Sequence, residues 1–408
     1  MMKPLLLLLA TISIARADFA LRDGDTLAFL GDSITAARGY TKVVEHYTLM
    51  RYPDRKVRFV NAGQGGDTAS GCLQRLERDV FDKGATVVTV AFGINDIGWG
   101  VKADDEHKKL YLDGIRTIIA RCKEKKVRPI ICSPAITSVL PDEAEKGYLQ
   151  TMTDEGMALA KSLGAETIDL QRGMREVQRR VLDHNSKAKP EDKVQMHMKD
   201  GIHLEDLGQM AMAYAMLKGL GAPEEVSSAT LDKNAANPEA KGCTISEVAF
   251  TANGVAFTRL DEGLPINFGP FTGLQYRWIT IPDGINRYML TVRNLSEGEY
   301  EIKADGRSVG TAKAGELAKG INIASKTGDP WYPGGPWDAQ SCVVKELVDS
   351  RDKLSEANRL QLSLLSSTVG PSLLQDISKQ DEELVALQRK TAKPRAYHFT
   401  LTLATPKP

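Results

Sequence analysis

The 408-residue sequence has little cysteine, few aromatic residues and no excess of charge of either sign. Five residues are Cys and 6% are aromatic, while 53 Lys and Arg balance 53 Asp and Glu. Balanced charge argues against nucleic acid or an anionic membrane surface as the main partner. A charged fraction of 26%, with 35 Gly and 18 Pro, argues against wholesale disorder. We therefore expect a globular chain of two or three domains.

The sequence also lacks an apolar run long enough to span a bilayer, which needs about 20 residues. Its longest run, residues 5–14, follows Lys3 and precedes a small-x-small site at Ala15 and Ala17. This pattern predicts a signal peptide over residues 1–17, cleaved after Ala17. The alternative is a buried N-terminal helix. We expect an exported protein of a bacterial periplasm or the extracellular space, with no stable membrane insertion after cleavage.

The few cysteines exclude a disulfide framework, although one disulfide stays open. Their number is odd and they show no C-x-x-C or Cys/His spacing typical of a metal site. Cys132 ends an apolar run, which favours a buried structural thiol over a nucleophile. The five positions are Cys72, Cys122, Cys132, Cys243 and Cys342.

Short apolar runs alternate with amphipathic stretches in the first half of the chain. Near-continuous apolar strands separated by helices predict a parallel sheet buried on both faces. We therefore expect a three-layer α/β/α domain over residues 18–222, with ligands at the carboxyl ends of its strands. The expected strands are residues 26–30, 57–61, 86–92, 128–132 and 166–169, and the clearest helices are residues 105–125 and 204–220.

The second half changes in character. Residues 223–242 are polar and weakly periodic, which predicts a linker. Residues 243–337 predict a small β-rich, sandwich-like accessory region, and residues 338–408 a C-terminal helical segment with a final strand. Within the β-rich region the expected strands are residues 274–281, 288–292 and 300–302, with turns at 282–284 and 305–306.

An aromatic cluster, Trp331, Tyr332 and Trp337, lies in a Pro- and Gly-rich stretch that predicts a rigid loop. Such aromatics either stack on sugar rings or seal a domain junction, and we favour the junction. Asp338 is expected to cap the helix that follows.

Four polar segments follow predicted strands or precede the last helix of the first domain. Each is common alone, but together they supply a nucleophile, a base, a carboxylate that orients the base, and donors for an oxyanion. A Gly-rich turn also lets backbone N–H groups approach a ligand. The segments are Gly31-Asp32-Ser33, Gly65-Gly66-Asp67-Thr68, Gly93-Ile94-Asn95-Asp96 and Asp200-Gly201-Ile202-His203.

With these four segments, residues 24–220 resemble the SGNH (GDSL-type) hydrolase family, and the resemblance implies a flavodoxin-like α/β/α fold with a parallel sheet. The resemblance implies that Ser33 is the nucleophile, His203 the base and Asp200 the carboxylate that orients it. It implies an oxyanion hole formed by the N–H groups of Ser33 and Gly66 and the side chain of Asn95. It implies no metal and no organic cofactor, and it assigns nothing to the second half of the chain.

A second serine fits a different motif. Ser308 in Gly306-Arg307-Ser308-Val309-Gly310 matches the nucleophile elbow of α/β-hydrolases, and His398 lies downstream. That elbow must join a parallel strand to a helix, whereas this serine follows a hairpin signal, so we do not expect it to be catalytic.

The remaining histidines carry less information. His46 and His107 are expected to be solvated on helices. His184 and His197 are expected in an exposed loop over residues 183–199, and only His197 could reach substrate.

The sequence thus predicts an exported serine esterase that acts on small-molecule or polysaccharide esters. O-acetyl groups on carbohydrate are the first choice, a choice that rests on the expected export, on the substrate range of the resembled family and on the lack of a long apolar lid segment. A lysophospholipase or short-chain lipid esterase, an inactive carbohydrate-binding surface protein and a metal-dependent hydrolase are the alternatives. A panel of esters with Ser33→Ala, and a chelator, would distinguish these possibilities.

Overall fold

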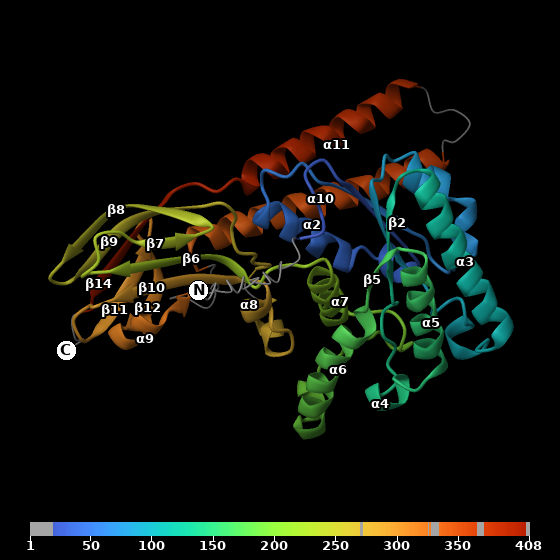
Figure 1. Cartoon of the computed structure of the whole chain (residues 1–408), viewed down its shortest axis with the longest axis horizontal. Coiled ribbons are helices and arrows are strands. Elements are labelled where there is room, and N and C mark those ends of the chain that lie inside the picture. The colour runs from blue at the N-terminus through green and yellow to red at the C-terminus, as the bar shows by residue number, and fades with distance from the viewer. Residues whose placement is uncertain (1–18, 270–271, 325, 328–333, 365–370, 405–408) are drawn as a thin grey trace, which may run out of the picture.

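The computed structural model describes residues 19–269, 272–324, 326–327, 334–364 and 371–404. An α/β unit lies at one end of the molecule and two further β-sheets lie at the other (Figure 1). Two long C-terminal helices run from the sheets across the α/β unit. The predicted three-layer fold, the β-rich region and the C-terminal helices are confirmed. The predicted signal peptide lies outside the described residues.

The sheet of the α/β unit has the strand order β2-β1-β3-β4-β5, and every pairing is parallel. Leu27 and Phe29 of β1 face one layer of helices, whereas Ala28 and Leu30 face the other. This alternation buries both faces of the strand, which explains its unbroken apolar sequence. The strands are β1 (Thr26–Gly31), β2 (Arg58–Gly63), β3 (Val87–Ala91), β4 (Arg128–Cys132) and β5 (Glu166–Ile168).

Helices α2, α6 and α7 pack on one face of this sheet, and α3 and α5 pack on the other. The amphipathic helix expected over residues 105–125 is α3, in which Ile115, Ile118 and Ile119 are buried. The helices are α1 (Ser33–Ala36), α2 (Gly39–Arg51), α3 (Asp105–Glu124), α4 (Pro141–Ala144), α5 (Tyr148–Ser162), α6 (Leu170–Lys187) and α7 (Asp206–Gly219), with short helices η1 (Gly71–Gln74), η2 (Glu77–Phe81), η3 (Gly98–Gly100) and η4 (Pro190–Asp192).

The accessory region contains two sheets. One has the order β13-β10-β6-β7, and the other, which is antiparallel, has the order β12-β11-β14-β9-β8. The last strand, β14, lies in the centre of the second sheet, so the chain leaves this region through two long helices and returns to complete it. The elements are β6 (Glu225–Asp232), β7 (Glu239–Lys241), β8 (Cys243–Thr251), β9 (Gly254–Asp261), η5 (Thr272–Arg277), α8 (Ile281–Gly284), β10 (Arg287–Arg293), β11 (Glu299–Ala304), β12 (Arg307–Lys313), α9 (Ala314–Lys319), β13 (Ile321–Asn322), α10 (Pro336–Leu364), α11 (Pro371–Ala392) and β14 (Tyr397–Leu403).

The segment predicted to be a linker forms strands β6 and β7 instead. Although the sequence of this segment is polar, β6 is a core strand. Its Ser227 is buried and donates to Asp261 Oδ1 at 2.6 Å. Asp261 in turn pairs with the fully buried Arg259, whose Nε lies 3.0 Å from Oδ1. Ser227 therefore takes a buried place in the same alternating series as Ala229 and Leu231, and hydrogen-bond partners on β9 satisfy its hydroxyl.

The strand predicted at residues 274–281 is also wrong. This segment forms the short helices η5 and α8, and the turn expected at residues 282–284 lies within α8. Ile279 and Ile281 are both buried on either side of the exposed Thr280. Burial of every second residue gives this irregular segment the alternating apolar pattern that is typical of a strand, and this is why a strand was predicted.

Trp337 is fully buried between Tyr288, Tyr397 and Phe399, and its indole N–H donates to the backbone oxygen of Ala324 at 3.1 Å. It is a core residue of the accessory sheets. Trp331 and Tyr332 lie outside the described residues.

Asp338, expected as a helix cap, accepts from the backbone N–H of Gly335 at 3.1 Å in the first turn of α10.

The accessory region and the α/β unit share one continuous hydrophobic cluster. Backbone hydrogen bonds also join them, with Leu264 N donating to Met50 O at 2.7 Å. The two parts therefore pack directly on each other.

All five cysteines are free thiols, and Cys132 is buried as expected. Within the residues that the structure describes, every helix is too short or too polar to cross a bilayer.

Candidate functional site

Ser33 lies where β1 ends and α1 begins. Asp32 caps this short helix, because its Oδ1 accepts from Ile34 N at 2.9 Å. Gly31 precedes Asp32, and a Cβ there would lie 2.2 Å from Thr35 Oγ1, so a larger residue would displace the Thr35 side chain. The turn leaves the Ser33 hydroxyl partly exposed at the carboxyl edge of the sheet.

His203 and Asp200 reach Ser33 from the loop before α7. His203 Nε2 lies 2.9 Å from Ser33 Oγ, and His203 Nδ1 lies 2.6 Å from Asp200 Oδ2. Asp200 Oδ1 accepts from the backbone N–H groups of Ile202 and His203 at 2.9 and 3.0 Å. The hydrogen bond with the His203 ring, together with these two N–H groups, lowers the pKa of Asp200 to about 2. The structure thus brings Ser33, His203 and Asp200 into one hydrogen-bonded chain.

The protonation pattern of this chain follows from its chemistry. An ionised carboxylate only accepts hydrogen bonds, so Nδ1 of neutral His203 carries the ring proton toward Asp200. Nε2 is then the acceptor, and the Ser33 hydroxyl donates to it. This arrangement can remove a proton from the serine oxygen.

Gly66 and Asn95 lie on the loops that follow β2 and β3, on either side of the loop that bears Ser33. Gly66 adopts a φ of 73°, which favours glycine. Asn95 Nδ2 donates to Asp67 O at 3.1 Å, and this amide nitrogen carries a second N–H. These loops place backbone and amide donors at the same edge of the sheet as Ser33.

Three carboxylates lie beneath these loops. Burial raises the pKa of Asp32 to about 6, and burial raises the pKa of Asp96 to about 7. Asp96 Oδ1 accepts from Ala69 N at 2.9 Å, which ties the loop after β3 to the loop after β2. Asp67 instead pairs with Arg75.

Two contributors were not predicted from the sequence. Trp99 donates its indole N–H to Asn95 Oδ1 at 2.8 Å, and its ring meets the His203 ring edge-on at 5.9 Å between centroids. Arg75 donates to Asp67 and to backbone oxygens at the ends of two strands. In the sequence, Trp99 stands between Gly98 and Gly100 directly after the Asn95 segment, and this position could have marked it as part of the site. Arg75 lies in no motif that could have indicated its role.

Comparison with known proteins agrees with this architecture. Residues 29–211 match the GDSL-like Lipase/Acylhydrolase family. These residues contain Ser33, Gly66, Asn95, Asp200 and His203.

Residues 29–211 belong to the GDSL-like lipase/acylhydrolase family. The chain is a carboxylic ester hydrolase.

Solved structures resemble this hydrolase to different extents. BT4096, described as a gut microbial diltiazem-metabolizing enzyme, superposes with a TM-score of 0.80 at 22% identity, over 94% of this chain and 98% of its own. The accessory sheets and C-terminal helices therefore belong to a fold that has been seen before.

Two smaller structures match only half of the chain. LAE5, an alpha/beta hydrolase from the metagenome of Lake Arreo in Spain, has a TM-score of 0.42 at 23% identity over 50% of this chain and 98% of its own. The acetyl-xylooligosaccharide esterase Axe2 from Geobacillus stearothermophilus, as a mutant, has a TM-score of 0.42 at 22% identity over 50% of this chain and 96% of its own. No curated protein matches the sequence.

A cleft of about 810 Å³ lies between the β2 edge of the hydrolase domain and the α10–α11 hairpin. Gly63 and Gln64, just before Gly66, line it together with Arg351 and Asp352 of α10. Arg38, five residues after Ser33, pairs with Asp352 at 2.6 Å. The C-terminal hairpin therefore borders the loops that bear the candidate site.

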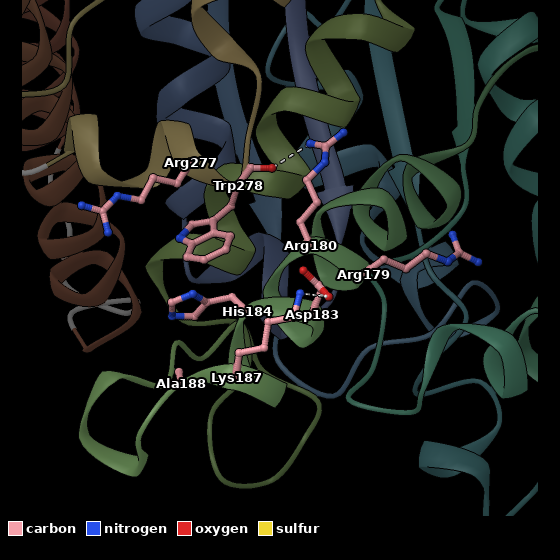
Figure 2. Close-up of a pocket in the computed structure, with 8 residues that line it drawn as sticks. All are labelled: Arg179, Arg180, Asp183, His184, Lys187, Ala188, Arg277 and Trp278. Carbon is pink, nitrogen blue, oxygen red and sulfur yellow. Dashed lines mark hydrogen bonds and ion pairs between the residues drawn. The ribbon is translucent and has the colours of Figure 1, made fainter.

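A second groove, of about 630 Å³, lies between the end of α6 and the segment around Trp278 (Figure 2). The Trp278 and His184 rings meet edge-on at 4.8 Å, and Arg180 donates to Trp278 O at 2.8 Å. Lys187 pairs with Asp183 at 2.7 Å. None of its lining residues belongs to the Ser33 chain, and its contacts join α6 to the accessory region.

The other histidines differ in part from expectation. His46 is not solvated but buried, with Nε2 2.9 Å from Ser341 Oγ of α10. His184 lies on α6 rather than in a loop. His197 is half-buried, with Nε2 3.2 Å from Ile136 O, and His107 pairs with Asp104 at 2.8 Å.

Ser308 lies in β12, which pairs with β11 through the hairpin turn predicted at residues 305–306. This antiparallel setting is not the strand-to-helix turn that a nucleophile elbow requires.

Proposed function

We propose that the chain is an exported serine esterase that removes O-acetyl groups from carbohydrates through an acyl-enzyme. The observation that carries this proposal is the hydrogen-bonded chain from Ser33 through His203 to Asp200. The predicted signal peptide supports export.

In the proposed reaction, Ser33 Oγ attacks the ester carbonyl carbon while its proton moves to His203 Nε2. The bond to the alcohol oxygen then breaks, and His203 returns the proton to that oxygen. A water molecule attacks the Ser33 ester in the same way and releases the acid. Asp200 stays ionised and stabilises the imidazolium formed in each half of the reaction.

The negative oxygen of each tetrahedral intermediate needs donors that are already in place. We propose that these are the N–H groups of Ser33 and Gly66 and the Nδ2 amide of Asn95. The Ser33 N–H lies in the first turn of a helix, where N–H groups have no partner within the helix. A donor of this kind accelerates turnover by about 10²–10³-fold.

The openness of the site supports a short acyl group on a large alcohol. The side chains of His203 and Asp200 are 29% and 34% exposed, and a Cβ at Gly66 would meet open space. A substituent on a polysaccharide can reach such a site, whereas a long acyl chain requires apolar surface that shields it from water.

Release of acid from a panel of esters tests this proposal. The panel contains acetylated xylan, acetylated pectin, simple acetyl sugars and lysophospholipids, and wild type is compared with Ser33→Ala and with Ser308→Ala. We expect acetate from the sugars, lost in Ser33→Ala and retained in Ser308→Ala. Fatty acid release would instead indicate a lysophospholipase, and no turnover on any substrate would favour a binding protein. Turnover that survives in Ser33→Ala would contradict the proposed nucleophile.

A further inference from the structure

Trp99 has a backbone conformation that bulky residues rarely adopt. Its φ and ψ are 60° and 27°, and its neighbours Gly98 and Gly100 also have positive φ values of 52° and 99°. The left-handed region disfavours a residue with a Cβ, so a tryptophan there costs free energy that a third glycine would not. Strain of this kind is concentrated at functional sites.

The side chain of Trp99 is not needed to shape its loop. Backbone hydrogen bonds close the loop, with Gly98 N donating to Asn95 O at 2.9 Å and Trp99 N donating to Ile94 O at 3.0 Å. Trp99 is also 51% exposed, so burial of the indole does not explain the residue. Its side-chain contacts offer an explanation instead.

The indole N–H determines which way the Asn95 amide faces. An indole nitrogen only donates, so the Asn95 atom 2.8 Å away must be the carbonyl oxygen Oδ1. Asn95 Nδ2 then faces Asp67 O at 3.1 Å, which only accepts. In a flipped amide, Asn95 Nδ2 would face the Trp99 N–H, which is also a donor, and Asn95 Oδ1 would face Asp67 O, which is also an acceptor. Trp99 and Asp67 together therefore hold Nδ2 as the donor on the substrate side.

We propose that Trp99 is a positioning residue that holds the Asn95 amide ready for the oxyanion, an inference that rests on the function proposed above. Because its ring also meets the His203 ring edge-on at 81°, one side chain contacts both the amide donor and the base. Preorganised donors accelerate the chemical step more than they strengthen substrate binding, so the effect belongs in kcat.

Trp99→Phe tests the inference, because phenylalanine keeps a ring beside His203 and loses the N–H. We expect kcat for acetate release to fall by about 10-fold with KM almost unchanged, since the amide loses one of its two anchors but not its N–H. Asn95→Ala should lose about 10²–10³-fold. If Trp99 acts through Asn95, adding Trp99→Phe to Asn95→Ala lowers kcat no further.

Trp99→Gly provides a second variant that cannot fail through backbone strain. It should also lower kcat by about 10-fold or more, without lowering Tm, because glycine relaxes the left-handed conformation. Trp278→Phe is the matched control, since Trp278 contacts His184 and Arg180 away from Ser33, and it should retain wild-type kcat.

Two results would overturn the inference. One is wild-type kcat in both Trp99→Phe and Trp99→Gly, and the other is multiplication of the Trp99→Phe and Asn95→Ala losses in the double variant. Ser33→Ala separates this outcome from failure of the proposed function. Turnover in Ser33→Ala would reject the function itself, whereas an inactive Ser33→Ala with a wild-type Trp99→Phe would reject only the role of Trp99.

Discussion

Nε of Arg75 lies 2.6 Å from Oδ2 of Asp67, and both side chains are 6% exposed. Arg75 also donates through Nη1 to Ala62 O at 2.7 Å and through Nη2 to Gly31 O at 3.2 Å. One buried guanidinium thereby joins the ends of β1 and β2 to the loop that contains Gly66. A planar group with several fixed donors suits this task, whereas a lysine ammonium does not.

Replacing Arg75 tests this arrangement. Arg75→Met should destabilise the fold by about 3–5 kcal/mol, because it leaves the Asp67 carboxylate buried without its partner. Urea unfolding at pH 7 measures the loss. Arg75→Met combined with Asp67→Asn should recover part of it, since the uncompensated charge is gone. A loss below about 1 kcal/mol in the single variant would show that Asp67 finds other solvation.

Replacing Asp200 tests the proton path. Asp200→Asn keeps the size of the side chain but can offer an N–H to Nδ1, which favours the wrong tautomer of His203. We expect kcat to fall by about 10⁴-fold with the fold intact. Asp142→Asn is the control, because that carboxylate is 91% exposed and pairs with Arg179 rather than with a member of the Ser33 chain. Equal activity in the two variants would argue that Asp200 does not orient the base.

The buried His46 predicts a stability change with pH. Burial lowers its pKa from 6.5 to about 4, so the unfolded chain takes up the proton first as the pH falls. The contribution of neutral His46 to the free energy of unfolding is therefore complete above pH 6.5 and is lost as the pH falls toward 4. Between pH 7 and pH 5 the free energy of unfolding should fall by about 2 kcal/mol for this reason.

His46→Gln, which cannot protonate, isolates this effect. Asp32 and Asp96 have raised pKa values, and their contribution changes in the opposite sense over an overlapping range. Both proteins contain Asp32 and Asp96, so these contributions cancel when the free energy of unfolding of His46→Gln is subtracted from that of wild type. This difference, measured by urea unfolding, should change by about 2 kcal/mol between pH 7 and pH 5. A difference that is constant with pH would mean that His46 titrates normally.

Ser308 provides a negative prediction. Ser308 lies near the start of β12, which pairs antiparallel with β11, so residues 309–313 continue the strand before helix α9 begins. Ser308→Ala should therefore keep wild-type kcat and KM on the substrate that the panel identifies. A large loss of kcat would instead indicate that the accessory sheets contribute to catalysis.

Much of the α/β unit could be predicted because its strands are buried on both faces and its helices are amphipathic. A short, unbroken apolar run such as residues 26–30 then indicates a buried strand, and this run lies in β1. The accessory region was harder, because Ser227 occupies a core position of β6 and its partners, Arg259 and Asp261, lie 32 and 34 residues later. His46 was misjudged for the same reason, since its partner Ser341 lies on a helix almost 300 residues away.

The candidate site divides in a similar way. Ser33, Gly66, Asn95, Asp200 and His203 lie in short motifs directly at strand ends, so their residue types and spacing indicate them. Trp99 and Arg75 act through contacts with those residues. A side chain whose role depends on the direction of one N–H has no signature in a single sequence.

Labelling with a fluorophosphonate, followed by peptide mass spectrometry, tests the central claim most directly. Cleavage after Arg22 and Arg38 yields a peptide, residues 23–38, in which Ser33 is the only serine. The account predicts one adduct on this peptide in wild type and in Ser308→Ala, and none in Ser33→Ala. An adduct elsewhere in the chain, or an unlabelled but active wild type, would contradict it.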